Sequence, residues 1–280
     1  MSRLARTLLA ALGALVLVVG AGCTEQPPAG PNPLPNASGS VSASPGVTLP
    51  PVGNGCRDVA TQGLTLRLVN AAGHSIAAVD LGSGPMGVVL AHQSDASMCQ
   101  WLPYATVLAS KGYRVVAFDF AGFGASSMPR QKTYLEDIRT VVSYLRDRGT
   151  PRVVVMGASM GATMSIVAAA AIERPPVEGV IALSPPLMFD GVNAEKAAPS
   201  LHTPALYIAG DADGDYEVYA QQINQATPSE LRNLLVVSAP QHGIQFVAAD
   251  TPEAAAVRAA IESFLAQRLR PGPSGSPTPR

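Results

Sequence analysis

Short apolar runs alternate with longer amphipathic stretches over most of this chain. Runs of about four to eight apolar or β-branched residues predict strands, and apolar residues about three or four positions apart predict helices. The predicted strands lie at 65–70, 75–81, 87–92, 114–120, 152–157, 179–184, 205–210 and 234–238. The predicted helices lie at 102–111, 134–148, 160–173, 216–226 and 253–269.

The order of these elements predicts the fold class. The first two strands follow each other without a helix, which predicts an antiparallel hairpin at one edge of a sheet. From the third strand on, strands and helices alternate, which predicts parallel neighbours joined by helical crossovers. The later strands are apolar throughout, as is typical of parallel strands covered on both faces. We therefore expect an α/β protein with three layers, α/β/α, around a mostly parallel eight-stranded sheet.

The N-terminus has the pattern of a targeting segment. Arg3 and Arg6 precede residues 8–22, which are uncharged and mostly apolar. This run is shorter than the roughly 20 residues that span a bilayer, and it is typical of a secretory signal peptide. Because small residues lead directly to Cys23, the segment resembles a bacterial lipoprotein signal. We expect a signal peptide at 1–22, a lipid on Cys23 and an extracytoplasmic protein attached to the bacterial cell membrane; an ordinary signal peptide and a secreted protein are the alternative.

Composition divides the rest of the chain. Residues 23–52 and 271–280 are rich in Pro, Ser and Gly, and such segments bury too little apolar surface to offset the entropy of ordering. We expect the first to be a disordered tether and the second a disordered tail, with the folded domain at 53–270. The formal net charge is −1. No basic excess is present to neutralise phosphates, which argues against nucleic-acid binding.

The chain contains three cysteines. If Cys23 carries a lipid, Cys56 and Cys99 remain as an even pair in an oxidising compartment. We expect a disulfide between them, with two free buried thiols as the alternative.

The strongest chemical signal is the segment Gly157-Ala158-Ser159-Met160-Gly161. It follows an apolar strand and opens a helical run, which is the strand–turn–helix context of a nucleophile elbow. Glycines on either side permit a tight turn, so the serine hydroxyl projects from the sheet edge toward the helix N-terminus. The pattern predicts Ser159 as a nucleophile; a small-residue turn without chemistry is the alternative.

A nucleophilic serine needs a base and an acid that orients it. His242 follows the last predicted strand, at the sheet edge where open α/β folds bind ligands. His74 is expected in a hairpin turn, and His202 is expected at the opposite edge of the sheet. We therefore expect neither to take part in the chemistry. We assign the acid to Asp213, with Asp211 as the alternative, because both follow the strand at 205–210.

The alternating carboxylates Asp211, Asp213 and Asp215 also permit a calcium interpretation. The spacing lacks the bidentate acidic residue of a full calcium loop. We therefore expect no metal and no cofactor. The order Ser159, Asp213, His242 is the one found in α/β-hydrolases.

Four further segments resemble the α/β-hydrolase family over about residues 64–269. They are the turn at 119–126, the acid-bearing strand end at 206–213, the His-Gly ending at 241–243 and the loop at 90–94. The resemblance implies an oxyanion hole made of the Met160 and Ser94 amides, and His92 as loop scaffolding. Gln93 stands where the family usually has Gly, so it either narrows the loop, adds a side-chain donor or impairs the hole. A disulfide at Cys99 would pin this loop.

The resemblance also bears on the substrate. Residues 185–204 leave no room for a cap domain, as in dienelactone hydrolases and small esterases, and the absence of an Asp nucleophile argues against epoxide hydrolase or dehalogenase chemistry. We expect hydrolysis of a small-molecule ester or similar acyl bond. The expected substrate-binding residues are Gln93, Leu187, Met188 and Ile244. An acyltransferase, a peptidase and a non-catalytic surface binding protein on the same scaffold remain alternatives.

Overall fold

The computed structural model describes Cys56 and residues 63–268. The expected signal peptide at 1–22, Cys23, the tether at 23–52 and the tail at 271–280 lie outside the described residues. Among the described residues, no helix combines the length and apolar character needed to span a bilayer.

Eight strands form one sheet in the order β1-β2-β4-β3-β5-β6-β9-β10. β2 pairs antiparallel with both β1 and β4, and the six strands from β4 to β10 are parallel, which confirms the predicted edge hairpin and mostly parallel sheet. The strand bounds are β1 Leu64–Val69, β2 Ser75–Leu81, β3 Met86–Ala91, β4 Arg114–Phe118, β5 Arg152–Ala158, β6 Gly179–Leu183, β9 Ala205–Gly210 and β10 Arg232–Val237.

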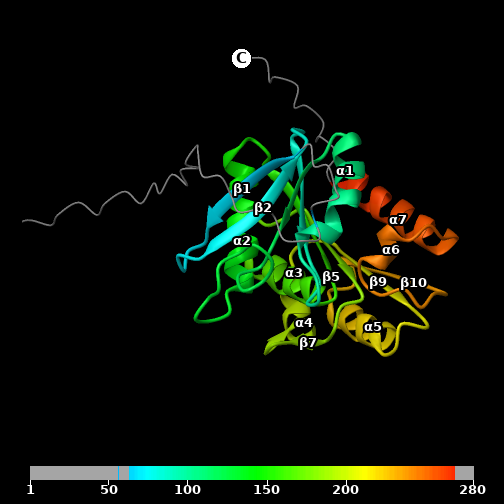
Figure 1. The fold of residues 1–280 in the computed structure, drawn as a ribbon. Coiled ribbons are helices and arrows are strands. Elements are labelled where there is room, and N and C mark those ends of the chain that lie inside the picture. Colours follow the sequence, from blue (N-terminus) through cyan, green and yellow to red (C-terminus); the bar gives the residue numbers. More distant parts are fainter. Residues whose placement is uncertain (1–55, 57–62, 269–280) are drawn as a thin grey trace, which may run out of the picture. The chain divides into compact units, whose positions relative to one another are not determined.

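Helices cover both faces of the sheet, which confirms the three-layer prediction (Figure 1). Side chains of α2, α3, α4 and α5 share one buried cluster, whereas those of α1, α6 and α7 share the other. The helix bounds are α1 Leu102–Ser110, α2 Tyr134–Asp147, α3 Met160–Ala171, α4 Ala194–Ala197, α5 Tyr216–Ala226, α6 Gln245–Ala248 and α7 Pro252–Arg268, with 3-10 turns η1 Met98–Trp101 and η2 Ala198–Ser200.

The strand sequences account for this layering. Apart from half-buried Arg152 at its start, β5 is buried throughout, as is β6, because each contacts helices on both sides. Continuous runs of Val, Ile, Ala and Leu suit that environment. The edge strand β10 has exposed and half-buried positions and is less regular in pattern. That weaker pattern explains why the predicted strand at 234–238 begins two residues later than the observed one.

The connection between β6 and β9 contains a small hairpin that the sequence patterns did not predict. Its strands are β7 Met188–Phe189 and β8 Val192–Asn193, followed by α4 and η2. Strands of two residues give no periodic pattern from which to predict them. Only these short elements occupy the connection, so no cap domain covers the described part of the sheet.

The strand order reverses at the centre of the sheet. The chain passes from β3 to β4 on one side and then returns to β5 on the other side of β3. In open α/β sheets, ligands bind beyond the carboxyl ends of the strands at such a switch point. The loops after β3 and β5, which carry Ser94 and Ser159, meet there.

Candidate active site

Ser159 occupies a strained turn between β5 and α3. Its backbone has φ 49° and ψ −118°, a conformation sparsely populated by residues other than glycine. Such strain costs roughly 1–3 kcal/mol and persists only where the surroundings impose it. Here the Ser159 amide donates to the Leu183 carbonyl at 2.8 Å, which links the turn to the end of β6. Among the described residues, the side chain of His242 bonds Asp213, and no hydrogen bond joins it to the Ser159 hydroxyl.

The two glycines of the elbow are required by close backbone contacts. A Cβ at Gly157 would collide with the carbonyl of Gly161. A Cβ at Gly161 would collide with the carbonyl oxygens of Ala91 and His92, at the end of β3. Gly157 therefore lets α3 lie close to β5, the strand that precedes it, and Gly161 lets α3 lie close to the end of β3. The contacts explain the spacing of the two glycines around Ser159.

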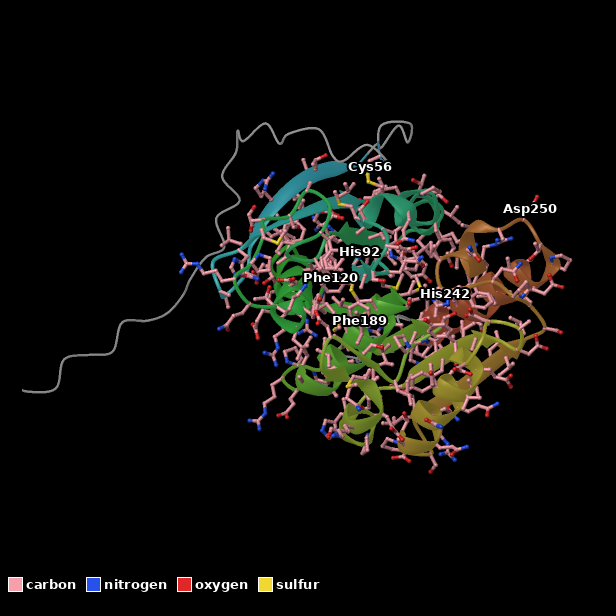
Figure 2. All side chains as sticks on the ribbon, turned by 60° about the horizontal axis from the view of Figure 1, so that its bottom comes forward. Cys56, His92, Phe120, Phe189, His242 and Asp250 are labelled. Carbon is pink, nitrogen blue, oxygen red and sulfur yellow. A yellow bond between two sulfur atoms is a disulfide. The ribbon has the colours of Figure 1, made fainter. Side chains whose placement is uncertain are left out.

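His242 and Asp213 lie together at the carboxyl edge of the sheet. Nδ1 of His242 is 3.0 Å from both carboxylate oxygens of Asp213. Asp213 is 8% exposed, so its carboxylate is largely shielded from water. The ring of Tyr216, the first residue of α5, lies 4.3 Å from the His242 ring, centroid to centroid. The histidine, labelled in Figure 2, is therefore held in place by its acid and by an aromatic neighbour.

Ser184 supports this pair, and the sequence analysis did not identify it. Its hydroxyl donates to Oδ2 of Asp213 at 2.6 Å and accepts from the Gly243 amide at 3.0 Å. Ser184 is fully buried and has φ 47°. One side chain thus joins the acid to the loop between β10 and α6 that carries His242, here called the histidine loop. Its signal in the sequence was a polar residue at the carboxyl end of an apolar strand.

The other carboxylates after β9 have different partners. Asp211 accepts from the Ala239 amide at 3.0 Å and from the Ser238 hydroxyl at 2.9 Å, so it anchors the loop after β10. Asp215 precedes α5 and accepts a long hydrogen bond from Tyr219 at 3.4 Å. In the described part of the chain, no group of three or more His, Cys, Asp or Glu side chains is placed to hold a metal ion. The structure therefore brings Asp213, not Asp211, to His242.

Two backbone amides in the loops after β3 and β5 lack a hydrogen-bond partner among the described residues. Met160 is the first residue of α3, and an amide at that position has no partner within its helix. Ser94 lies in the exposed loop after β3. Within residues 63–268, neither amide donates to another protein group. The start of α3 contributes positive potential, which favours negative charge close to these amides.

His92 lies beneath this loop as a fully buried, neutral side chain. Its Nδ1 donates to the Gln93 carbonyl at 2.7 Å, and its Nε2 accepts from the Phe120 amide at 3.1 Å. Burial lowers the pKa of His92 because desolvation penalises the charged imidazolium. Figure 2 shows His92 next to Phe120, and their ring centroids are 5.2 Å apart. These contacts fit the expected role of His92 as loop scaffolding.

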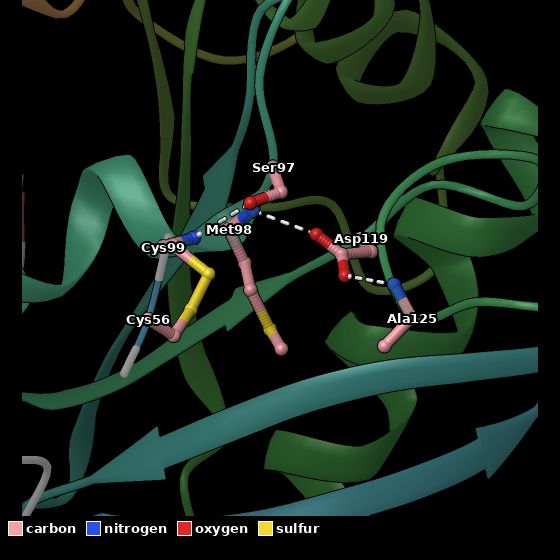
Figure 3. The surroundings of a disulfide bond; sticks show 6 residues. All are labelled: Cys56, Ser97, Met98, Cys99, Asp119 and Ala125. Atoms are coloured by element: carbon pink, nitrogen blue, oxygen red, sulfur yellow. Dashed lines mark hydrogen bonds between the residues drawn. A yellow bond between two sulfur atoms is a disulfide. The ribbon is translucent and has the colours of Figure 1, made fainter. Parts of the chain in front are cut away.

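The expected disulfide between Cys56 and Cys99 is confirmed. The two Cα atoms are 4.9 Å apart, and Cys99 lies in η1, shortly after the Ser94 loop. Figure 3 shows the neighbouring network, in which the Asp119 carboxylate accepts from the amides of Met98 at 2.6 Å and Ala125 at 2.7 Å. Burial raises the pKa of Asp119, and these two amides counteract the shift. The disulfide and this carboxylate together fix the segment that follows the loop.

The expected substrate-binding residues fall into two groups. Gln93 and Ile244 are in contact, because Oε1 of Gln93 accepts from the Ile244 amide at 3.3 Å. Leu187 and Met188 lie in the connection after β6, where Met188 is 59% exposed.

Ile244 also lines a mostly apolar groove of about 390 Å³ between α1 and α6, with Pro103, Tyr104, Val107 and Val247 among its other walls. His202 is remote from these residues and lines a different cavity, near the start of β5.

This architecture is the α/β-hydrolase fold, as solved structures confirm. An esterase of Pyrococcus furiosus is similar with a TM-score of 0.63 at 18% identity, covering 76% of this chain and 93% of its own. The enol-lactonase of Burkholderia xenovorans is similar with a TM-score of 0.60 at 16% identity, covering 71% and 99%.

Sequence comparison matches shorter parts of the chain. Residues 86–201 match a family model described as serine aminopeptidase, S33. The bifunctional epoxide hydrolase 2 of Sus scrofa is 28% identical over 159 residues, which are 56% of this chain and 27% of that protein. Across four curated relatives, the matched stretches span only 15% to 36% of the relative's own length.

Proposed function

We propose that this protein is a serine hydrolase that cleaves a small ester or similar acyl bond through an acyl-enzyme. The observation that carries the proposal is the Asp213–His242 pair, placed at the same sheet edge as the strained turn of Ser159. A serine hydroxyl is a weak nucleophile until a base removes its proton. An acid bonded to Nδ1 leaves Nε2 of the histidine to act as that base.

In the proposed reaction, Nε2 of His242 takes the Ser159 proton as the serine oxygen bonds to the acyl carbon. The carbonyl oxygen becomes an oxyanion and accepts from the amides of Met160 and Ser94, which have no other partner among the described residues. His242 then gives its proton to the departing alcohol oxygen, which leaves the acyl group on Ser159. Water then attacks the acyl carbon as His242 takes its proton. His242 returns this proton to the Ser159 oxygen as the bond between that oxygen and the acyl carbon breaks, which releases the acid product. These residues need no cofactor for any step.

The side chains close to His242 favour an apolar substrate. The groove between α1 and α6 contains Ile244, two residues after His242, and its walls are mostly apolar. We propose that Gln93, Leu187, Met188 and Ile244 border the bound ester. A serine at the elbow, in place of a carboxylate nucleophile, favours ester hydrolysis over the epoxide opening named in the mammalian relatives.

Turnover of p-nitrophenyl esters tests the proposal. Wild-type protein is compared with Ser159→Ala over acetyl to octanoyl substrates, with thermal unfolding as the folding control. The expected result is release of p-nitrophenol by wild type and none above background by a Ser159→Ala variant that unfolds at a similar temperature. Retained turnover in that variant would refute the assignment.

A peptidase is the second candidate, and the description of the matched family model supports it. The same residues would attack an amide, and the amine would take the proton from His242. Aminoacyl p-nitroanilides assayed beside the esters separate the two candidates. Faster turnover of an anilide than of the matching ester would favour the peptidase.

We also propose that the protein acts outside the cytoplasm, attached to the membrane through Cys23. The sequence pattern around Cys23 and the Cys56–Cys99 disulfide support this location, because disulfides persist in oxidising compartments. Incorporation of a labelled fatty acid into the full chain, and its loss in Cys23→Ala, is the corresponding test.

A further inference from the structure

Gln93 connects the two loops that the proposed reaction must align. Its Oε1 accepts from the Ile244 amide at 3.3 Å, across 151 residues of sequence, and its Nε2 donates to Oδ1 of Asp95 at 2.8 Å. Its backbone is also held, since its amide donates to Oε1 of Gln100 at 3.3 Å and its carbonyl accepts from His92. Gln93 directly precedes Ser94, and Ile244 lies two residues after His242.

The orientation of the Gln93 amide is determined by its two partners. A carboxylate only accepts hydrogen bonds, and a backbone amide only donates them. The nitrogen of Gln93 must therefore face Asp95, and the oxygen must face Ile244. The bond from the Ile244 amide is important for the short helix α6. Ile244 is the N-cap residue of that helix, and its amide has no partner within the helix.

The histidine loop is shaped to receive this side chain. Gly243 has φ +53°, and a Cβ built there would lie 2.7 Å from Oε1 of Gln93. The same Gly243 amide donates to Ser184, which in turn bonds Asp213. Gln93 therefore closes a chain of contacts that runs from the Ser94 loop to His242 and its acid.

We propose that Gln93 is a positioning residue that holds the Ser94 loop in register with the His242 loop. This inference rests on the proposed function, and it assigns Gln93 to loop alignment. The sequence left three possibilities for Gln93 in place of glycine: a narrower loop, an added side-chain donor or an impaired oxyanion hole. The bond to Ile244 is different from all three, because in it the Gln93 side chain accepts from the neighbouring loop. A displacement of about 1 Å in a reacting group can lower a rate about 100-fold, so a link of this kind matters for turnover.

Gln93→Met is the first test, because methionine has a similar length and lacks both polar groups. Gln221→Met is the matched control. Gln221 is a half-buried residue of α5, and within the described part of the chain its side chain bonds Glu217 alone. For Gln93→Met we expect kcat on p-nitrophenyl butyrate to fall about tenfold or more, a larger factor than any rise in KM, because methionine still borders the ester but no longer links the two loops. The control should retain the wild-type kcat. An unchanged kcat in Gln93→Met would overturn the inference.

Rescue separates positioning from a general loss of packing. In Gln93→Glu the new carboxylate faces Asp95, and like charges repel. Adding Asp95→Asn re-forms this bond in the opposite direction, because the asparagine amide donates to the glutamate, while the glutamate still accepts from Ile244. We expect the double variant to recover most of the kcat that Gln93→Glu loses. A double variant no faster than Gln93→Glu would contradict the proposed link.

Hydrogen exchange of the Ile244 amide tests the link without any turnover. We expect Gln93→Met to accelerate exchange about tenfold or more, because the amide loses its acceptor, and Gln221→Met to leave it unchanged. Unchanged exchange in Gln93→Met would refute the link even if the enzyme is active. Failure of the proposed function would appear elsewhere, as turnover in Ser159→Ala.

Discussion

The Ser184 hydroxyl donates to the Asp213 carboxylate at 2.6 Å while it accepts from the Gly243 amide. We predict that Ser184→Ala lowers kcat/KM about tenfold, because the acid loses a donor and the histidine loop loses an acceptor. The unpaired Gly243 amide should also cost about 1–3 kcal/mol of unfolding free energy. Steady-state kinetics and urea unfolding measure the two effects.

Ser165→Ala is the control for this variant. Ser165 is also buried, but its hydroxyl donates to the Gly161 carbonyl within α3 and has no contact with Asp213. Equal loss of kcat/KM in both variants would show that the Ser184 effect is not specific to the acid.

Asp213 and Asp211 make a second matched pair. Asp213→Asn should lower kcat by about 10³ to 10⁴, because an amide neither stabilises the charged imidazole nor favours the required tautomer. Asp211→Asn should retain turnover and lose about 1 kcal/mol of unfolding free energy, since it weakens the bond to Ala239. A larger kcat loss in Asp211→Asn than in Asp213→Asn would reverse the assignment.

Gly161 provides a prediction about the elbow itself. Gly161→Ala should destabilise the fold by about 2–3 kcal/mol and reduce activity, because the new Cβ meets the carbonyls of Ala91 and His92. Gly149→Ala is the control, at a position with φ +81° where a Cβ meets nothing within 4 Å. It should cost about 1–2 kcal/mol from its backbone conformation and leave kcat unchanged. Full activity in Gly161→Ala would contradict the tight packing of α3.

Buried His92 should make stability depend on pH. Its pKa is lowered in the folded protein, so below about pH 6.5 the unfolded chain takes up a proton that the folded protein does not. Unfolding free energy should therefore fall as pH drops from 7 to 5, by at most about 1.4 kcal/mol per unit from this group. Asp119 acts in the opposite direction, because its raised pKa lets the folded protein bind a proton first.

His92→Asn isolates the histidine contribution. Urea unfolding at pH 7 and pH 5 should show a smaller fall for the variant than for wild type. Identical falls in both proteins would mean that His92 charges as easily in the folded protein as in the unfolded chain.

The sequence predicted the features that depend on local pattern. The turn at Ser159 was predicted because strand, turn and helix are contiguous, and the parallel sheet was predicted because its strands are continuously apolar. Ser184 and the Gln93–Ile244 bond were not found, because their partners lie 29 to 151 residues away. The choice between Asp213 and Asp211 also depended on which carboxylate the turn after β9 directs toward His242. The hairpin of β7 and β8 was too short to leave a pattern.

Labelling with a fluorophosphonate probe tests the central claim most directly, because the probe reacts only with an activated serine. Wild type, Ser159→Ala and His242→Ala are treated alike, and the modified peptide is identified by mass spectrometry. We predict one adduct on Ser159 in wild type and none in either variant. An adduct in folded Ser159→Ala, or none in folded wild type, would contradict the proposed serine hydrolase.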